Sequence, residues 1–151
     1  MAGRRIAMRM FLFGCMGLVF EIFYIALHDA VFGGNWNLRG HSSLWMIPVY
    51  ALPGLLTGPV SHRLKNRHIP LPFRAFIYML MIFAVEYVSG VLFTAAGLDI
   101  WNYSNLRWNL HGHIALSYVP VWYFLALWLE YLYRLIDGCA CVLVKSHKTT
   151  Q

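Results

Sequence analysis

The stretch GHIALSYVPV, residues 112–121, decides the fold, because it repeats an earlier stretch, GHSSLWMIPV, residues 40–49. Both begin with Gly-His and reach Pro-Val after six further residues. Upstream of these stretches, a shift of 65 residues gives eight identities over positions 9–37, with Glu21 matching Glu86. The shift then grows to 72, because the second copy carries a seven-residue insertion. A recurring period of this kind predicts an internal duplication.

Each copy has the length of a helical hairpin, the first over about residues 9–60 and the second over about residues 73–136. Two membrane crossings per copy make the copies parallel, so the implied pseudo-twofold axis runs along the membrane normal. The alternative is chance convergence of two membrane hairpins. We expect residues 1–151 to form one membrane domain, in which residues 137–151 are a cytoplasmic tail.

The composition predicts an integral membrane protein. Of the 151 residues, 60% are apolar and 12% are charged, and the mean hydropathy is +0.56. So few charges cannot cover a soluble domain. Four apolar stretches are long enough to cross a hydrocarbon core about 30 Å thick: residues 8–32, 42–60, 73–97 and 113–136. We expect an all-α membrane protein with four transmembrane helices, since no alternating barrel pattern is visible.

The basic residues predict the orientation. Ten of the twelve Lys and Arg residues flank one side of the expected helices, and only Arg39 and Arg107 fall on the other. The positive-inside rule therefore places both termini in the cytoplasm. Topology also accounts for the net charge of +6, so no nucleic-acid partner is expected. The first stretch has a basic start like a signal peptide, but its apolar core is long and contains Glu21, so we expect it to remain as a helix.

Two acidic residues lie deep in the expected helices. Glu21 follows Arg9 by twelve residues and Glu86 follows Arg74 by twelve, which places each about 18 Å above the basic end. A charged carboxylate at that depth costs at least about 2.5 kcal/mol. One acid is therefore expected to hold a proton, or the two to share one, near neutral pH. They are either polar contacts between helices or a proton, cation or substrate site.

Other acidic and small residues have simpler interpretations. Glu130 precedes Arg134 by four residues, a spacing that predicts an ordinary ion pair on one helix. Gly54 and Gly58 predict a close contact between helices. Pro53 and Pro59 are expected to kink or end the second helix.

The outer connections form a candidate motif of aromatic and polar residues. Its members are Trp36, Asn37, Gly40, His41, Trp101, Asn102, Tyr103, Ser104, Gly112 and His113. The aromatic residues are typical of a membrane–water boundary, and the histidines fit the same level. The prolines of the two Pro-Val pairs are expected about two turns into the returning helices. No strong metal-binding spacing occurs, so we expect neither a metal nor another cofactor.

The three cysteines do not predict a disulfide framework. Cys15 falls within the first expected helix. Cys139 and Cys141 follow the last one on the cytoplasmic side, where S-palmitoylation is one interpretation and plain thiols are the other.

Several short motifs resemble a known family. They are EYVSG at 86–90, WNYS at 101–104 and GHIALSY at 112–118, followed by Trp122. These motifs resemble the vertebrate transmembrane protein 229 family and the bacterial CmpB-like components of type IV ABC transporters, over roughly residues 11–133. Asn102 and Ser117 replace an Asp and a Glu of the family pattern. The resemblance implies a multi-pass membrane protein, and an ATP-driven role would need a separate subunit because this chain has no nucleotide-binding motif.

Two functions remain open at this stage. The first is an accessory or structural membrane component that packs in the lipid bilayer against copies of itself or other membrane subunits. The second is a small permease-like transport module that uses Glu21 and Glu86. No nucleophile and base can be paired from their spacing, so the protein is not expected to be an enzyme.

Overall fold

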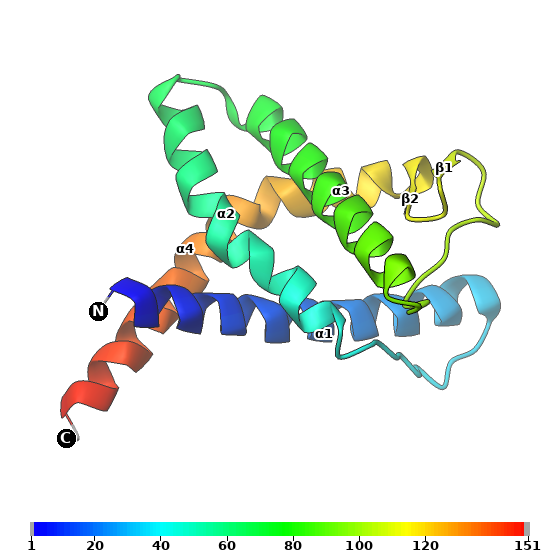
Figure 1. The fold of residues 1–151 in the computed structure, drawn as a ribbon, viewed down its shortest axis with the longest axis horizontal. Coiled ribbons are helices and arrows are strands. Elements are labelled where there is room, and N and C mark those ends of the chain that lie inside the picture. The colour runs from blue at the N-terminus through cyan, green and yellow to red at the C-terminus, as the bar shows by residue number, and fades with distance from the viewer. Residues whose placement is uncertain (1, 150–151) are drawn as a thin grey trace.

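The computed structural model describes residues 2–149, which form four long helices (Figure 1). They are α1 (Ala2–Gly33), α2 (Met46–Asn66), α3 (Leu71–Ala95) and α4 (Val119–Thr149). The connection before α4 also contains the short antiparallel strands β1 (Asn109–Leu110) and β2 (Ile114–Ala115) and the 3-10 helix η1 (Leu116–Tyr118). The expected all-α class with four long helices is confirmed.

The helices pack as two hairpins that contact each other. α1 packs mainly on α2 and α3 mainly on α4, while α4 also contacts α1 and α2 contacts α3. Figure 1 shows both termini and the α2–α3 connection at one end of the molecule, and the other two connections at the opposite end. We call these the basic end and the loop end. The basic end contains Arg5, Arg9, Lys65 and Arg74.

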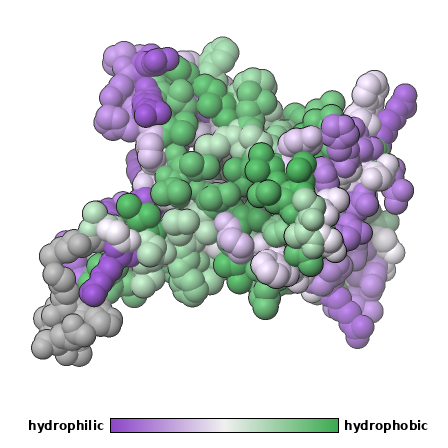
Figure 2. Space-filling model, in the orientation of Figure 1, coloured by the Kyte–Doolittle hydropathy of each residue, from purple (hydrophilic) through white to green (hydrophobic). Residues whose placement is uncertain are grey.

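The surface carries an apolar belt between two polar ends. In Figure 2 apolar residues gather over the middle of the molecule and hydrophilic residues over its ends. Large apolar side chains such as Phe23 on α1, Leu92 on α3 and Phe124 on α4 are exposed. Both α1 and α3 are long and apolar enough to cross a membrane. An apolar surface of this extent needs lipid or protein to cover it.

The prolines of the Pro-Val pairs do not lie where the sequence analysis expected them. Pro48 and Pro120 occupy the first turns of α2 and α4, and not positions two turns into them. The N–H groups of a first turn have no partner within the helix, so proline removes no hydrogen bond there. His113 lies in a turn and the chain from Ile114 to Tyr118 forms β2 and η1, so α4 begins six residues after the expected start of the last apolar stretch. Within the segment predicted to be a cytoplasmic tail, residues 137–149 continue α4, and residues 150–151 lie outside the described part.

Helix α2 runs through Pro53 and Pro59 without ending, and its two glycines permit close packing. A Cβ placed on Gly54 would lie 3.0 Å from Cδ2 of Phe13 on α1. A Cβ on Gly58 would collide with the hydroxyl of Tyr133 on α4. The predicted close contact is therefore confirmed, and it involves two different helices.

A buried ionic cluster joins three helices at the basic end. Glu130 on α4 is 7% exposed. It accepts hydrogen bonds from Arg74 Nε at 2.8 Å and from the Tyr78 hydroxyl at 2.7 Å, and Lys65 Nζ lies 2.8 Å from its other oxygen. The predicted pairing with Arg134 is wrong. Glu130 faces the interior, where Arg74 and Tyr78 of α3 meet it, while Arg134 on the next turn is exposed.

A second ionic cluster ties α1 to α2 and α4. Arg9 is buried, and it donates to the carbonyl oxygen of Gly54 at 2.6 Å and to Asp137 at 2.7 Å. Its guanidinium also lies 4.7 Å from the ring centre of Tyr133. Asp137, which follows the last apolar stretch, pairs with Arg5 as well. Burial alone would raise the pKa of Asp137, but hydrogen bonds from Arg5 and Arg9 outweigh it and hold the pKa below its usual value.

The Glu130 cluster yields a stability prediction. We expect Glu130→Gln to lower the free energy of unfolding by about 3 kcal/mol or more, because it removes the buried carboxylate that compensates the half-buried charge of Arg74. Arg134→Gln is the control, and we expect it to change stability by less than about 0.5 kcal/mol. Denaturation of both variants in detergent measures the difference. Equal losses would restore the pairing predicted from the sequence.

Candidate functional site

Glu86 is the most deeply buried acid toward the loop end. It lies on α3 and is 9% exposed. One carboxylate oxygen, Oε1, accepts a hydrogen bond from the Tyr103 hydroxyl at 3.1 Å. The other, Oε2, is buried without a partner, and so is the indole Nε1 of Trp122, although Trp122 lies close enough to interact with Glu86. Because buried polar atoms are nearly always paired, this carboxylate has capacity for another donor.

The loop before α4 positions Tyr103 for this contact. The Tyr103 N–H donates to the carbonyl oxygen of Gly112 at 2.8 Å, and the N–H of Ser104 donates to the Asn102 side chain at 2.9 Å. Gly112 has a φ of +73°, and a Cβ there would lie 2.6 Å from Ser104 Oγ. Burial and the nearby Glu86 raise the pKa of Tyr103. Tyr103 therefore stays protonated and donates.

Trp101 and His113 secure the same loop against α3. Trp101 Nε1 donates to the carbonyl oxygen of His113 at 2.9 Å, and its ring stands edge-on to Phe93 at 5.7 Å. The His113 ring covers Gly90, one turn after Glu86, where a Cβ would lie 2.8 Å from Nδ1. His113 thus packs against the helix. In residues 2–149, no three His, Cys, Asp or Glu side chains are grouped to hold a metal ion.

The surroundings of Glu21 are arranged differently. The Ser42 hydroxyl donates to Glu21 Oε2, and Gly40 lies so close to the Ile22 carbonyl that a Cβ would collide with it. This close approach brings Ser42 to the carboxylate. Three other members of the predicted motif, Trp36, Asn37 and His41, are exposed, with Trp36 at 74%.

Tyr50 lies between the two acids. Its ring packs against Gly17, and its hydroxyl interacts with Glu21 and also, electrostatically, with Glu86. Tyr50 directly follows one Pro-Val pair and Trp122 follows the other. Each therefore places an aromatic donor beside the acid of the preceding helix. The sequence analysis missed the roles of Tyr50 and Ser42, although their positions after Pro-Val and Gly-His were a usable signal.

The predicted lipidation residues lie far from these acids, near the end of α4. Cys139 is exposed and Cys141 is half-buried, and both are free thiols. Their acylation stays a prediction.

Comparison with known proteins gives one family. The family model described as "Putative ABC-transporter type IV" matches residues 8–149. No solved structure matches the chain.

The Glu86 contact yields a spectroscopic prediction. We expect Tyr103→Phe to shift the infrared carboxyl band of Glu86, because it removes the hydrogen bond to Oε1, and to lower stability by about 1 kcal/mol. Difference spectra against Glu86→Gln assign the band. Tyr131→Phe, at an exposed site on α4, is the matched control and should leave the band in place. An unchanged band in Tyr103→Phe would contradict the contact.

Proposed function

Because the chain belongs to the family described as putative ABC-transporter type IV, we propose that it is an accessory or structural membrane component that works with other subunits. A motif for nucleotide binding is absent from the 151 residues. Any ATP-driven step would therefore occur on a separate partner. Membership in this family, together with two helices able to span, makes it a membrane component.

We propose that all four helices cross the bilayer, with the basic end in the cytoplasm. The apolar belt in Figure 2 and the ten-to-two distribution of basic residues support this orientation. We also propose that the two hairpins are parallel repeats. Arg9 and Arg74 occupy matching positions, and each binds an acid of α4 and a backbone carbonyl.

The observation that carries the subunit role is a surplus of positive charge at the basic end. The buried cations there are paired with Glu130 and Asp137. By contrast, three other arginines of the basic end are exposed and make no ion pair in the described part of the chain. They are Arg63 near the end of α2, Arg67 directly after it, and Arg134 on α4. An exposed cationic surface next to a rigid ionic core suits docking of an acidic protein surface.

The subunit role yields a prediction about assembly. We expect the tagged protein, extracted from its own membrane in mild detergent, to co-purify in fixed stoichiometry with a subunit that hydrolyses ATP. Arg63→Ser with Arg67→Ser should weaken the complex at low salt and make the remaining affinity less sensitive to salt, because fewer charge pairs are left to be screened.

The matched control removes two charges at the loop end, through Arg39→Ser with Arg107→Ser. This variant should leave the complex intact. A protein that purifies alone, or a complex lost equally in both double variants, would contradict docking at the basic end.

The second candidate is a permease-like transport module, and one observation favours it. Glu86 keeps an unpartnered oxygen in a buried position, and Tyr50 interacts with both acids. A purely structural carboxyl would be expected to have both oxygens satisfied, as in Glu130. The pair can therefore exchange a proton or hold a cation if water reaches it.

Titration of the two acids tests this candidate. For a transport role we expect a carboxyl infrared band that changes between pH 5 and 9 in lipid nanodiscs, and that disappears in Glu86→Gln or Glu21→Gln. Asp99→Asn, at an exposed position of the loop end, should keep the band. A band fixed across this range would mean that the acids only join helices.

A further inference from the structure

A groove lined by aromatic rings runs between the loop-end halves of α1 and α4. Its volume is about 570 Å³. On α1, Tyr24, His28 and Phe32 are spaced one turn apart, with ring centres 6.1 Å and 5.0 Å from one another. Tyr118 and Val121 form the facing wall. Aromatic faces therefore line both sides of the groove.

The carboxyl group of Glu86 lies behind this groove. The Tyr118 ring packs 5.1 Å from Tyr103 and 6.4 Å from Trp122. The Tyr118 hydroxyl interacts electrostatically with both Tyr24 and Glu86. Tyr118 thus separates the groove from the carboxylate whose Oε2 has no partner. No Lys or Arg side chain in the described part of the chain pairs with Glu86.

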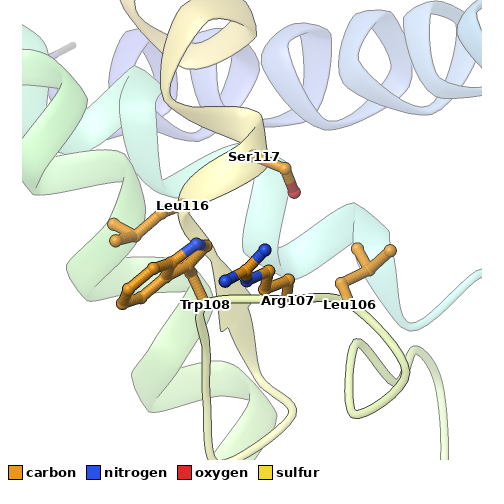
Figure 3. Close-up of a pocket in the computed structure, with 5 residues that line it drawn as sticks. All are labelled: Leu106, Arg107, Trp108, Leu116 and Ser117. Carbon is orange, nitrogen blue, oxygen red and sulfur yellow. The ribbon is translucent and has the colours of Figure 1, made fainter.

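The nearest cation of the loop is held in a neighbouring hollow. This hollow, of about 560 Å³, contains Arg107 and Trp108, as Figure 3 shows. The guanidinium of Arg107 lies 5.6 Å from the Trp108 ring centre. Leu106 and Ser117 line both hollows, whereas Arg107 lines only the second. The aromatic groove is therefore left without a positive charge from an arginine or a lysine.

We propose that this groove binds a compact organic ammonium ion. Aromatic faces attract cations, most strongly where water is displaced. When Glu86 is ionised, its charge acts through a medium of low dielectric constant, which strengthens its attraction for a bound cation. A metal cation would need several oxygen ligands, which these mainly apolar walls do not supply. A neutral apolar molecule would gain nothing from Glu86.

This binding goes beyond the subunit role, and it shares Glu86 with the transport alternative. It does not require Glu86 to titrate or the ligand to cross the membrane. A carboxyl band fixed as the neutral acid would remove the attraction of Glu86 and contradict the proposal, whereas a failed binding experiment leaves the subunit role standing.

The experiment compares a cation with its uncharged isostere. Choline and 3,3-dimethyl-1-butanol have nearly the same shape, so only the charge distinguishes them. Isothermal titration calorimetry uses the full chain in maltoside micelles, with empty micelles as background. We expect saturable choline binding and at least tenfold weaker binding of the alcohol.

Variants locate the site. We expect Tyr24→Leu, which removes one exposed aromatic wall, to weaken choline binding about three- to tenfold. Glu86→Gln should weaken it by a similar factor. Tyr131→Leu and Asp99→Asn are the matched controls outside the groove, and should bind as the wild type does.

Three results would overturn the proposal. Equal binding of choline and the alcohol would make the groove merely apolar. If the wild-type protein binds no choline, the groove is only a surface that water or lipid covers. Equal loss in Tyr24→Leu and Tyr131→Leu would place the cation elsewhere. Since Tyr24 is exposed, its replacement tests the site even if Glu86→Gln fails to fold.

Discussion

The cost of placing carboxylates among apolar helices governs much of this structure. Such a group needs opposite charge or several hydrogen-bond donors, because desolvation otherwise outweighs any packing gain. At the basic end, Glu130 accepts hydrogen bonds from Arg74 and Tyr78 and forms an ion pair with Lys65. Toward the loop end, Glu86 accepts a hydrogen bond from one tyrosine, Tyr103. The same physical requirement is therefore met fully at one end and only in part at the other.

This contrast indicates that the basic-end clusters stabilise the fold and that Glu86 belongs to a functional site. The basic-end clusters connect every helix through charged hydrogen bonds, with Arg9 reaching α2 and α4 and Glu130 reaching α2 and α3. Charged hydrogen bonds of this kind are stronger than neutral ones and fix geometry. Glu86, by comparison, keeps an orphan oxygen beside an orphan indole N–H. A buried network that is satisfied only in part is costly, and such sites are typical of function.

The sequence predicted the four helices and the special positions of Glu21 and Glu86, because hydropathy and internal repetition are local signals. The four-residue spacing, however, predicted an ion pair between Glu130 and Arg134. The partner in the structure is Arg74, which lies 56 residues away in the sequence. The start of α4 was misjudged because apolar β2 and η1 residues look like helix in composition. The role of Tyr50 was missed because it depends on how α1, α2 and α3 converge. Partners set by tertiary packing leave no periodic trace in the chain.

The different lengths of two loops explain why the surroundings of Glu21 and Glu86 differ. Between its Trp-Asn and Gly-His pairs, the loop before α2 has only Leu38 and Arg39, too few residues to form a strand pair. The loop before α4 has seven more residues between the same pairs, and it contains β1 and the turn at Gly112. That turn holds Tyr103 against Glu86, while Trp36 in the shorter loop stays exposed. Helices α1 and α3 thus carry acids at matching sequence positions, and the longer loop gives Glu86 an aromatic enclosure next to the α1–α4 groove.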